Sequence, residues 1–278
     1  MEALRTPDER FASLPGFSWA PHYFEWQGLR AHMLDEGPRD APVLLALHGE
    51  PTWSYLYRKM IPPFLAAGYR VVAPDFIGFG RSDKVVDDAW YTFDTHRAFL
   101  LDFVERMDLK RITLAVQDWG GLLGLTLPME APARYEKLLI MNTALGTGDR
   151  PLTEGFKSWR AYVANTPNLD CGKLLARACP HLSAAEAGAY EAPFPDSPDA
   201  PGAALSRSAR EWWQNAWQGD SFMAIGAKDP VLGPPVMHGL RKLIRNCPEP
   251  YVHAEGGHFL QEWGDDVARA ALAHWRKG

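Results

Sequence analysis

The chain has 278 residues, of which 46% are hydrophobic and 23% are charged; this balance is typical of a folded globular protein and excludes global disorder. The formal net charge of −5 excludes the basic surface of a general nucleic-acid-binding protein, so we expect no nucleic-acid partner. No apolar run approaches the roughly 18 residues of a membrane span, so we expect no membrane partner. The N-terminus lacks the apolar stretch of a signal peptide, and the three cysteines form no C-x-x-C pair. We therefore expect a cytoplasmic protein with reduced thiols and no metal site.

The first predicted element is a β-hairpin over residues 22–37, where apolar and polar residues alternate around a central Gln-Gly pair. After it, short apolar runs alternate with longer helical stretches. The runs cover residues 43–47, 70–73, 112–116, 138–141, 222–225 and 251–254. Continuously apolar strands separated by helices are typical of a parallel sheet that is covered on both faces. The sequence therefore predicts an α/β protein with a mostly parallel central sheet flanked by helices.

Residues 146–217 break this alternation. They contain three helical pieces (153–165, 171–178 and 183–190) but no convincing buried strand. Ligands of open α/β sheets bind at the carboxyl edge of the strands, so a helical insert over that edge would act as a lid. We therefore predict three segments, namely an N-terminal core part (1–145), a helical cap (146–217) and a C-terminal core part (218–278).

The strand at 112–116 runs into Gln-Asp-Trp-Gly-Gly, and a helical stretch follows. A sharp turn between strand and helix can present a nucleophile, and Asp118 occupies the position where esterases carry serine. The match is imperfect, because Val116 stands where the pattern has a small residue. The alternative is that Asp118 is only an N-cap of the following helix, a common role for aspartate.

Two further side chains favour a catalytic role for Asp118. Asp229 and His258 each follow a predicted strand, and the chain order nucleophile, acid, histidine is that of the α/β-hydrolase fold. Taken singly, Asp229 could be a turn former and His258 a structural histidine. The acid could instead sit at position 142, but Asn142 is an amide and cannot balance an imidazolium charge. We therefore predict the triad Asp118, Asp229 and His258 in an α/β-hydrolase fold, with the helical cap inserted after the sixth strand.

An aspartate nucleophile determines the type of reaction. A carboxylate is ionised at neutral pH and attacks a saturated carbon to form an ester, which water then hydrolyses. His258 would be the general base for that water. The ester intermediate needs an oxyanion hole, and we assign this role to the backbone amides of Glu50 and Trp119. The alternative for the His-Gly-Glu-Pro segment around Glu50 is a tight structural turn.

Taken together, these residues resemble the haloalkane dehalogenases. The matching segments are HGEPTWSYLYR (48–58), DFIGFGRSDK (75–84), VQDWGG (116–121), GAKDP (226–230) and GGHFLQEW (256–263). Glu50 resembles the subfamily typified by the dehalogenase that acts on 1,2-dichloroethane, and Asp229 with Asn142 agrees with that branch. The stretch from 195 to 210 looks shorter than in that branch, which puts the shape of the access route in question.

The resemblance implies that the indole N–H groups of Trp119 and Trp159 hold the departing halide, with Phe156 lining the same apolar pocket. Indole only donates hydrogen bonds, so it stabilises an anion without competing for a proton. Plain packing of the lid is the alternative for Trp159, and we take the tryptophans at 212, 213 and 217 as packing residues. The implied partners are a small neutral haloalkane and water, with halide as a product. We expect a monomer and no cofactor.

Three other functions compete with dehalogenation. An epoxide hydrolase shares the triad and lid but needs acidic hydroxyls over the nucleophile, for which Tyr162 and Tyr190 are candidates. A fluoroacetate-type dehalogenase needs arginines beside the nucleophile, where Trp119 stands. The alternative that is not an enzyme is a non-catalytic binding module of the same fold, and the intact triad argues against it.

Overall fold

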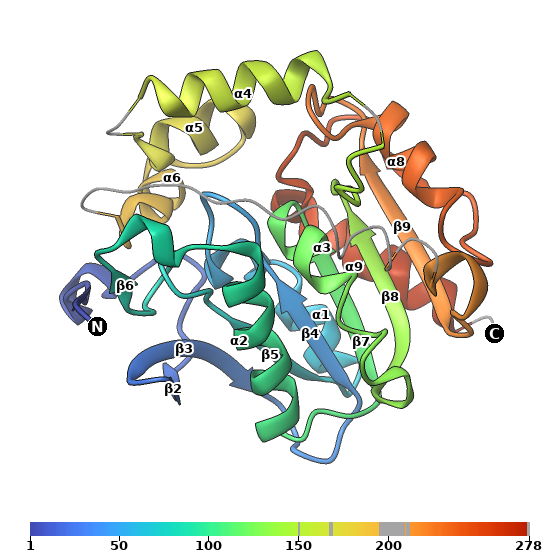
Figure 1. Ribbon diagram of the computed structural model, residues 1–278, viewed down its shortest axis with the longest axis horizontal. Helices are drawn as coiled ribbons and strands as arrows, with labels where there is room; N and C mark the ends of the chain where they lie inside the picture. The colour runs from blue at the N-terminus through green and yellow to red at the C-terminus, as the bar shows by residue number, and fades with distance from the viewer. Residues whose placement is uncertain (150, 167–168, 195–208, 210–211, 277–278) are drawn as a thin grey trace.

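The computed structural model describes the chain except residues 150, 167–168, 195–208, 210–211 and 277–278. Its main feature is an eight-stranded sheet with the strand order β10-β9-β8-β7-β4-β5-β3-β2 (Figure 1). Neighbouring strands from β10 to β5 are parallel, whereas β3 is antiparallel to both β5 and β2. The predicted mostly parallel sheet and the N-terminal hairpin are therefore confirmed.

The strands of this sheet coincide with the apolar runs of the sequence. Their bounds are β2 (His22–Trp26), β3 (Leu29–Glu36), β4 (Val43–Leu47), β5 (Arg70–Pro74), β7 (Ile112–Gln117), β8 (Tyr135–Met141), β9 (Asp220–Gly226) and β10 (Tyr251–His253). Every residue of β4, β5 and β7 is buried, because helices cover both sides of the central strands. A separate short ribbon pairs β1 (Ala3–Leu4) with β6 (Lys84–Val85).

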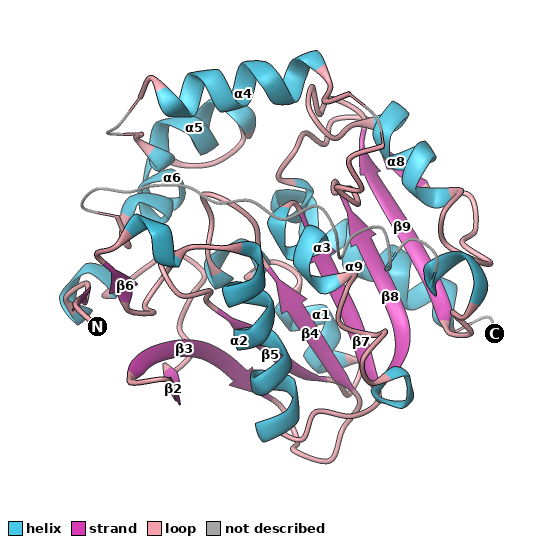
Figure 2. Cartoon of the chain, viewed as in Figure 1, coloured by secondary structure: helices cyan, strands magenta, loops and turns pink. Residues whose placement is uncertain are grey.

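Helices lie on both faces of the sheet (Figure 2). Successive side chains of a strand point to opposite faces, so β4 contributes to two separate hydrophobic clusters. Leu45 packs in the cluster that includes Phe99 of α2, whereas Leu44 packs in the cluster that includes Phe64 of α1 and Val267 of α9. The flanking helices are α1 (Ile61–Ala66), α2 (Phe93–Arg106), α3 (Trp119–Gly124), α8 (Pro234–Arg241) and α9 (Gly264–Trp275). Short 3₁₀ helices are η1 (Asp8–Phe11), η2 (Ser54–Tyr57), η3 (Asp88–Trp90), η4 (Pro132–Arg134) and η5 (Leu260–Trp263).

Among the described residues between β8 and β9 are three helices that we call the cap helices: α4 (Glu154–Ala164), α5 (Cys171–Ala178) and α6 (Ala184–Glu191). Each begins after a side chain that accepts a hydrogen bond from the helix backbone, namely Thr153, Asp170 and Ser183, which explains why helices form at these positions. Figure 1 shows α4 and α5 beyond the carboxyl ends of the central strands. Since β8 is the sixth strand of the main sheet, the helices are inserted where the sequence predicts them.

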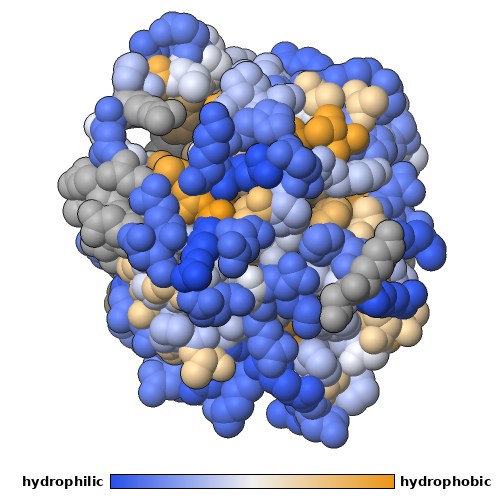
Figure 3. Space-filling view, turned by 90° about the vertical axis from the view of Figure 1, so that its right-hand side faces the viewer, coloured by the Kyte–Doolittle hydropathy of each residue, from blue (hydrophilic) through white to orange (hydrophobic). Residues whose placement is uncertain are grey.

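The stretch from 195 to 210, which looks short in the sequence, lies outside the described residues except for Ala209. No helix in the described part of the chain is long and apolar enough to cross a membrane. Figure 3 shows the right-hand side of the molecule as a largely hydrophilic face with separate apolar patches.

The predicted packing role of Trp213 and Trp217 is confirmed, since both are buried and their rings lie 4.9 Å apart. Trp212 packs against both.

Candidate active site

Asp118 lies in the sharp turn between β7 and α3. Its backbone has φ 49° and ψ −124°, a strained conformation that residues other than glycine rarely adopt. The backbone O of Asp118 accepts a hydrogen bond of 2.7 Å from the Thr143 hydroxyl, which helps to hold the turn. The Asp118 side chain makes no capping hydrogen bond to α3. The interpretation of Asp118 as only an N-cap is therefore wrong, because its carboxylate points to other partners.

Two glycines make room for this turn. A Cβ at Gly49 would lie 2.4 Å from the Asp118 side chain, and a Cβ at Gly120 would lie 2.1 Å from the backbone O of Leu47. Real Cβ atoms do not approach other atoms so closely, so both positions need glycine. The close approach brings the loop after β4 against the nucleophile turn.

The loop after β4 presents a backbone donor to the nucleophile. The backbone N of Glu50 donates a hydrogen bond of 3.0 Å to Oδ1 of Asp118. The predicted second donor of the oxyanion hole is the backbone amide of Trp119. Trp119 is the first residue of α3 and follows Asp118 directly. The structure thus brings both predicted oxyanion-hole residues next to the carboxylate.

The three predicted triad residues come together from three separate loops. His258, which follows β10, shares a hydrogen bond of 2.9 Å between its Nδ1 and Oδ2 of Asp229, which follows β9. Nε2 of His258 lies 3.5 Å from Oδ2 of Asp118. Oδ1 of Asp229 accepts backbone hydrogen bonds of 2.8 Å and 3.0 Å from Val231 and Leu232, and its side chain is fully buried. The Nδ1 of His258 therefore contacts the acid, Asp229, and its Nε2 faces the nucleophile, Asp118.

The two carboxylates control the protonation of His258. Burial alone would lower the pKa of His258, but Asp229 and Asp118 outweigh it and raise that pKa to about 10. Burial alone would raise the pKa of Asp229, but His258 and the hydrogen bonds from Asn142 and Val231 hold it below its ordinary value. The two carboxylates therefore favour the protonated form of His258 in the free protein.

Two amide side chains contact the triad without having been predicted as site residues. The side-chain N of Asn142 donates a hydrogen bond to Asp229, while its Oδ1 accepts one of 3.0 Å from the backbone of Gly226. The side-chain N of Gln117 lies 3.1 Å from Nε2 of His258 and donates to the His258 backbone O at 3.3 Å. For Asn142 the signal was its position after β8; for Gln117 the only signal was its place next to Asp118.

The predicted residues of the cap lie on α4. Phe156 and Trp159 are both half-buried and about one turn apart, so they share a face of the helix. Trp159 packs against the core cluster on the side of α1 and α9, whereas Trp119 packs against the cluster on the opposite side. Among the described residues, the ring contact of Trp159 is with Tyr162, at 6.0 Å between centroids. The structure therefore places the two indoles on separate elements and not in contact with each other.

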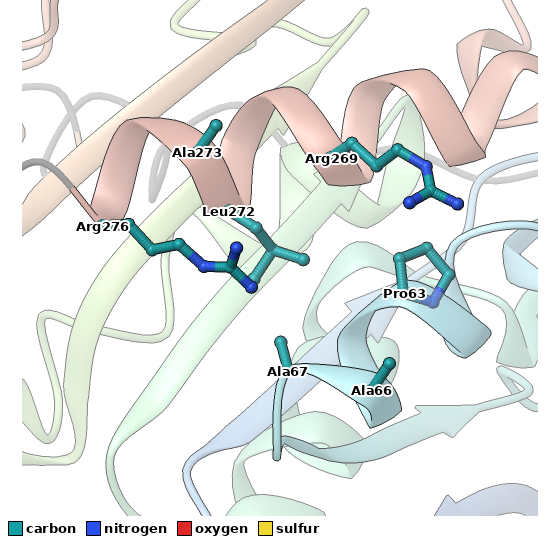
Figure 4. Close-up of a pocket in the computed structure, with 7 residues that line it drawn as sticks. All are labelled: Pro63, Ala66, Ala67, Arg269, Leu272, Ala273 and Arg276. Atoms are coloured by element: carbon teal, nitrogen blue, oxygen red, sulfur yellow. The ribbon is translucent and has the colours of Figure 1, made fainter.

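A surface pocket lies elsewhere, between α1 and α9 (Figure 4). Pro63, Ala66 and Leu272 contribute an apolar lining, and Arg269 and Arg276 stand at its rim. The Arg269 guanidinium is already paired with Asp265 at 2.7 Å. Its lining contains no nucleophile and no base, so this pocket is not a candidate active site.

The fold, the nucleophile turn and the order of the triad define the class of this protein: it is an α/β hydrolase. The sequence model of the α/β hydrolase fold matches residues 42–265. This class includes many chemistries, so relatives are needed to define the family.

Full-length relatives identify that family. The chain is 41% identical to a haloalkane dehalogenase from Psychrobacter cryohalolentis, over 97% of this chain and 96% of that protein. It is 39% identical to a haloalkane dehalogenase from Mycobacterium marinum, over 99% and 100% of the two chains. A solved structure of the tetrameric haloalkane dehalogenase DpaA from Paraglaciecola agarilytica NO2 superposes with a TM-score of 0.93 at 45% identity, covering 98% of each chain. The chain belongs to the haloalkane dehalogenase family.

Proposed function

We propose that this protein hydrolyses short haloalkanes to an alcohol, a halide ion and a proton through an alkyl ester on Asp118. The observation that carries the proposal is the carboxylate in the nucleophile turn, which faces Nε2 of His258 at 3.5 Å and has no capping role. Membership of the haloalkane dehalogenase family supports the same reaction. As proposed, the reaction needs no metal and no cofactor.

In the first step, an oxygen of Asp118 attacks the carbon that bears the halogen. The carbon–oxygen bond forms as the carbon–halogen bond breaks, and the halide leaves with the bonding electrons. We assign stabilisation of the halide to the indole N–H groups of Trp119 and Trp159, and contact with the substrate chain to Phe156. The support is their placement, with Trp119 beside the nucleophile and the other two half-buried on α4.

In the second step, water attacks the carbonyl carbon of the ester. Once Asp118 is esterified it has no charge, so one of the two carboxylates that raise the pKa of His258 is lost. His258 then gives up its proton to solvent, which is the proton that the overall reaction releases, and accepts one from the attacking water through Nε2, while Asp229 stabilises the imidazolium that forms. The backbone amides of Glu50 and Trp119 stabilise the developing oxyanion, and the ester breaks to alcohol and the Asp118 carboxylate.

We propose a separate role for each of the predicted segments. Residues 1–145 and 218–278 form the hydrolase core with the triad, and residues 146–217 form the cap that faces the substrate. The placement of α4, α5 and α6 between β8 and β9 supports this division.

Epoxide hydrolysis is less well supported, because the two candidate tyrosines do not converge on Asp118. Tyr190 is fully buried and donates its hydroxyl hydrogen bond to Glu262. Tyr162 is 42% exposed on α4. A ring-opening acid over the nucleophile would have to come from another side chain.

We propose that a single chain forms the catalytic unit and acts in the cytoplasm. The triad and the Glu50 backbone donor are brought together within the fold of one chain. The three cysteines are free and buried, as expected of a reducing compartment. DpaA is tetrameric whereas the sequence here predicts a monomer, so light scattering on the purified protein should decide the assembly.

The proposal is tested by comparing turnover of 1,2-dibromoethane, an epoxide and fluoroacetate, and then by trapping the ester. We expect bromide from 1,2-dibromoethane, no diol from the epoxide and no fluoride from fluoroacetate. In His258→Gln, mass spectrometry should show an alkyl adduct on the peptide containing Asp118. His274→Gln is the matched control, because His274 lies on α9 and pairs with Asp220; this variant should release bromide like the parent without accumulating the adduct. Bromide release by the parent without any adduct in His258→Gln contradicts the two-step reaction, and no turnover of any substrate favours a non-catalytic module.

A further inference from the structure

The amide of Gln117 touches the catalytic histidine directly. Gln117 is the last residue of β7, and its side chain is fully buried. Its Nε2 lies 3.1 Å from Nε2 of His258, the ring nitrogen that the proposed reaction uses as a base. A second hydrogen bond of 3.3 Å to the backbone O of His258 fixes the amide against the same residue.

The other end of this amide is unpaired. Oε1 of Gln117 is buried and has no hydrogen-bond partner among the described residues. Leaving a buried polar atom unpaired is unfavourable, so native structures avoid it unless the group has another role. An amide held in this orientation matches the neutral ring, because its N–H donates to the lone pair of a neutral Nε2, whereas a protonated Nε2 would face a second donor.

The two protonation states belong to different stages of the reaction. The charged groups that face His258 are Asp229, from the loop after β9, and Asp118, from the loop after β7. Phe259 covers the ring edge-on at 4.9 Å, and the ion pair of Lys228 with Glu255 on neighbouring loops is exposed. When Asp118 becomes an ester, its charge disappears, whereas the side-chain N of Gln117 remains 3.1 Å from Nε2.

We propose that Gln117 is a positioning residue whose amide holds Nε2 of His258 and favours the neutral imidazole that hydrolyses the ester on Asp118. This inference rests on the proposed function, since it concerns the second step of that reaction. It assigns Gln117 a role in hydrolysis of the ester and none in its formation, because displacement of the halide does not involve transfer of a proton.

Single-turnover measurements on Gln117→Glu and Gln117→Met test the inference. Enzyme in excess is mixed with 1,2-dibromoethane between pH 6 and 10, and mass spectrometry follows formation and decay of the adduct on Asp118. A carboxylate at position 117 favours the imidazolium, so the pH at which adduct decay becomes half-maximal should rise by about one pH unit or more in Gln117→Glu, which slows decay about tenfold at neutral pH. Gln117→Met should raise the pH of half-maximal adduct decay by less. The rate of adduct formation should change no more than about threefold in either variant.

Gln261→Met is the matched control, since Gln261 is also a fully buried glutamine, in the segment that follows His258, and its amide atoms have no hydrogen-bond partner among the described residues. It should leave the pH profile of decay unchanged. Identical pH profiles in the parent and both Gln117 variants, or equal losses in formation and decay, overturn the inference while leaving the proposed function intact. If no adduct forms in the parent or in His258→Gln, the proposed function fails instead.

Discussion

Two of the cap helices differ in how they are attached to the core. Helix α6 is tied down by buried contacts: the hydroxyl of Tyr190 donates to Glu262, and the indole of Trp53 donates to the backbone O of Ala189 at 3.2 Å. Arg10 reaches the backbone O of Ala192, just beyond the helix, at 2.7 Å. Helix α4, which carries Phe156 and Trp159, has no fully buried residue.

Because α6 and α4 are attached differently, they should contribute differently to the stability of the cap and to ligand binding. Local stability follows the number of buried contacts, so α6 should open only with the core, whereas α4 should open more easily. Two of the residues that we assign to the substrate and the halide, Phe156 and Trp159, lie on the loosely packed helix. Changes on α4 should therefore alter ligand binding more than folding, and changes on the α6 side should do the reverse.

The largest effect on stability is expected at Glu262. Its buried carboxylate pairs with both terminal nitrogens of Arg58, at 2.8 Å and 2.9 Å, and with Lys59 at 2.9 Å. Glu262→Gln leaves the Arg58 guanidinium buried without its main countercharge, and breaking such a pair costs about 3–5 kcal/mol. Denaturant unfolding followed by tryptophan fluorescence should show this decrease; a change under about 1 kcal/mol contradicts a firmly attached α6 side.

The same pair predicts a dependence of stability on pH. Burial alone would raise the pKa of Glu262, but Arg58 outweighs it and holds that pKa below its ordinary value of 4.5. A lowered pKa in the folded state contributes stability that is complete above the unfolded pKa and is lost as the pH falls through the folded pKa. The parent should thus lose stability below about pH 4.5 more steeply than Glu262→Gln. Parallel acid-unfolding curves contradict this.

Tyr190→Phe should have the next largest effect. It removes one buried hydrogen bond to a charged group, which is worth about 1.5–3 kcal/mol, and keeps the ring that packs against Tyr55 at 5.1 Å. Tyr162→Phe on α4 is the matched control, because that side chain is 42% exposed, and it should change the free energy of unfolding by less than about 0.5 kcal/mol. Equal effects of the two substitutions would remove the contrast between the helices.

Gly155→Ala tests a close contact of α4 with the loop that carries Asp229. A Cβ at Gly155 would lie 2.5 Å from the backbone O of Pro230, next to Asp229, so the helix must shift. We expect a net loss of about 1 kcal/mol, since overpacking outweighs the better helix propensity of alanine, together with a lower kcat/KM. Gly188→Ala on α6 is the control: a Cβ there meets no atom within 4 Å, so this substitution should stabilise the protein slightly and leave kcat/KM unchanged. An unchanged kcat/KM in Gly155→Ala would show that α4 is not positioned by this contact.

Trp159→Phe should have the smallest effect on stability, under about 1 kcal/mol, because the ring is only half-buried. It removes an N–H donor while keeping an aromatic ring, so bromide affinity should fall about tenfold, or about 1.4 kcal/mol. Quenching of tryptophan fluorescence by bromide measures this affinity. An unchanged bromide affinity would instead assign Trp159 to plain packing.

The sequence predicts much of the fold and the triad because each follows a local signal. Continuous apolar runs mark the central strands, and each triad residue follows one of them in a fixed chain order. Gln117 and Glu262 show what escapes such reasoning. Gln117 meets His258 across 141 positions, and Arg58 meets Glu262 across 204. A buried polar pair of that separation depends on how the loops close in three dimensions, and nothing in either local segment predicts it.

The central claim is that the oxygen of the first alcohol product comes from Asp118 and not directly from water. It is tested in a single turnover of 1,2-dibromoethane with enzyme in excess in water enriched in ¹⁸O. The account predicts that the alcohol is unlabelled and that the peptide containing Asp118 gains ¹⁸O, because water attacks the carbonyl carbon of the ester. An alcohol that carries ¹⁸O, with an unlabelled Asp118 peptide, would contradict the account and indicate direct displacement of the halide by water.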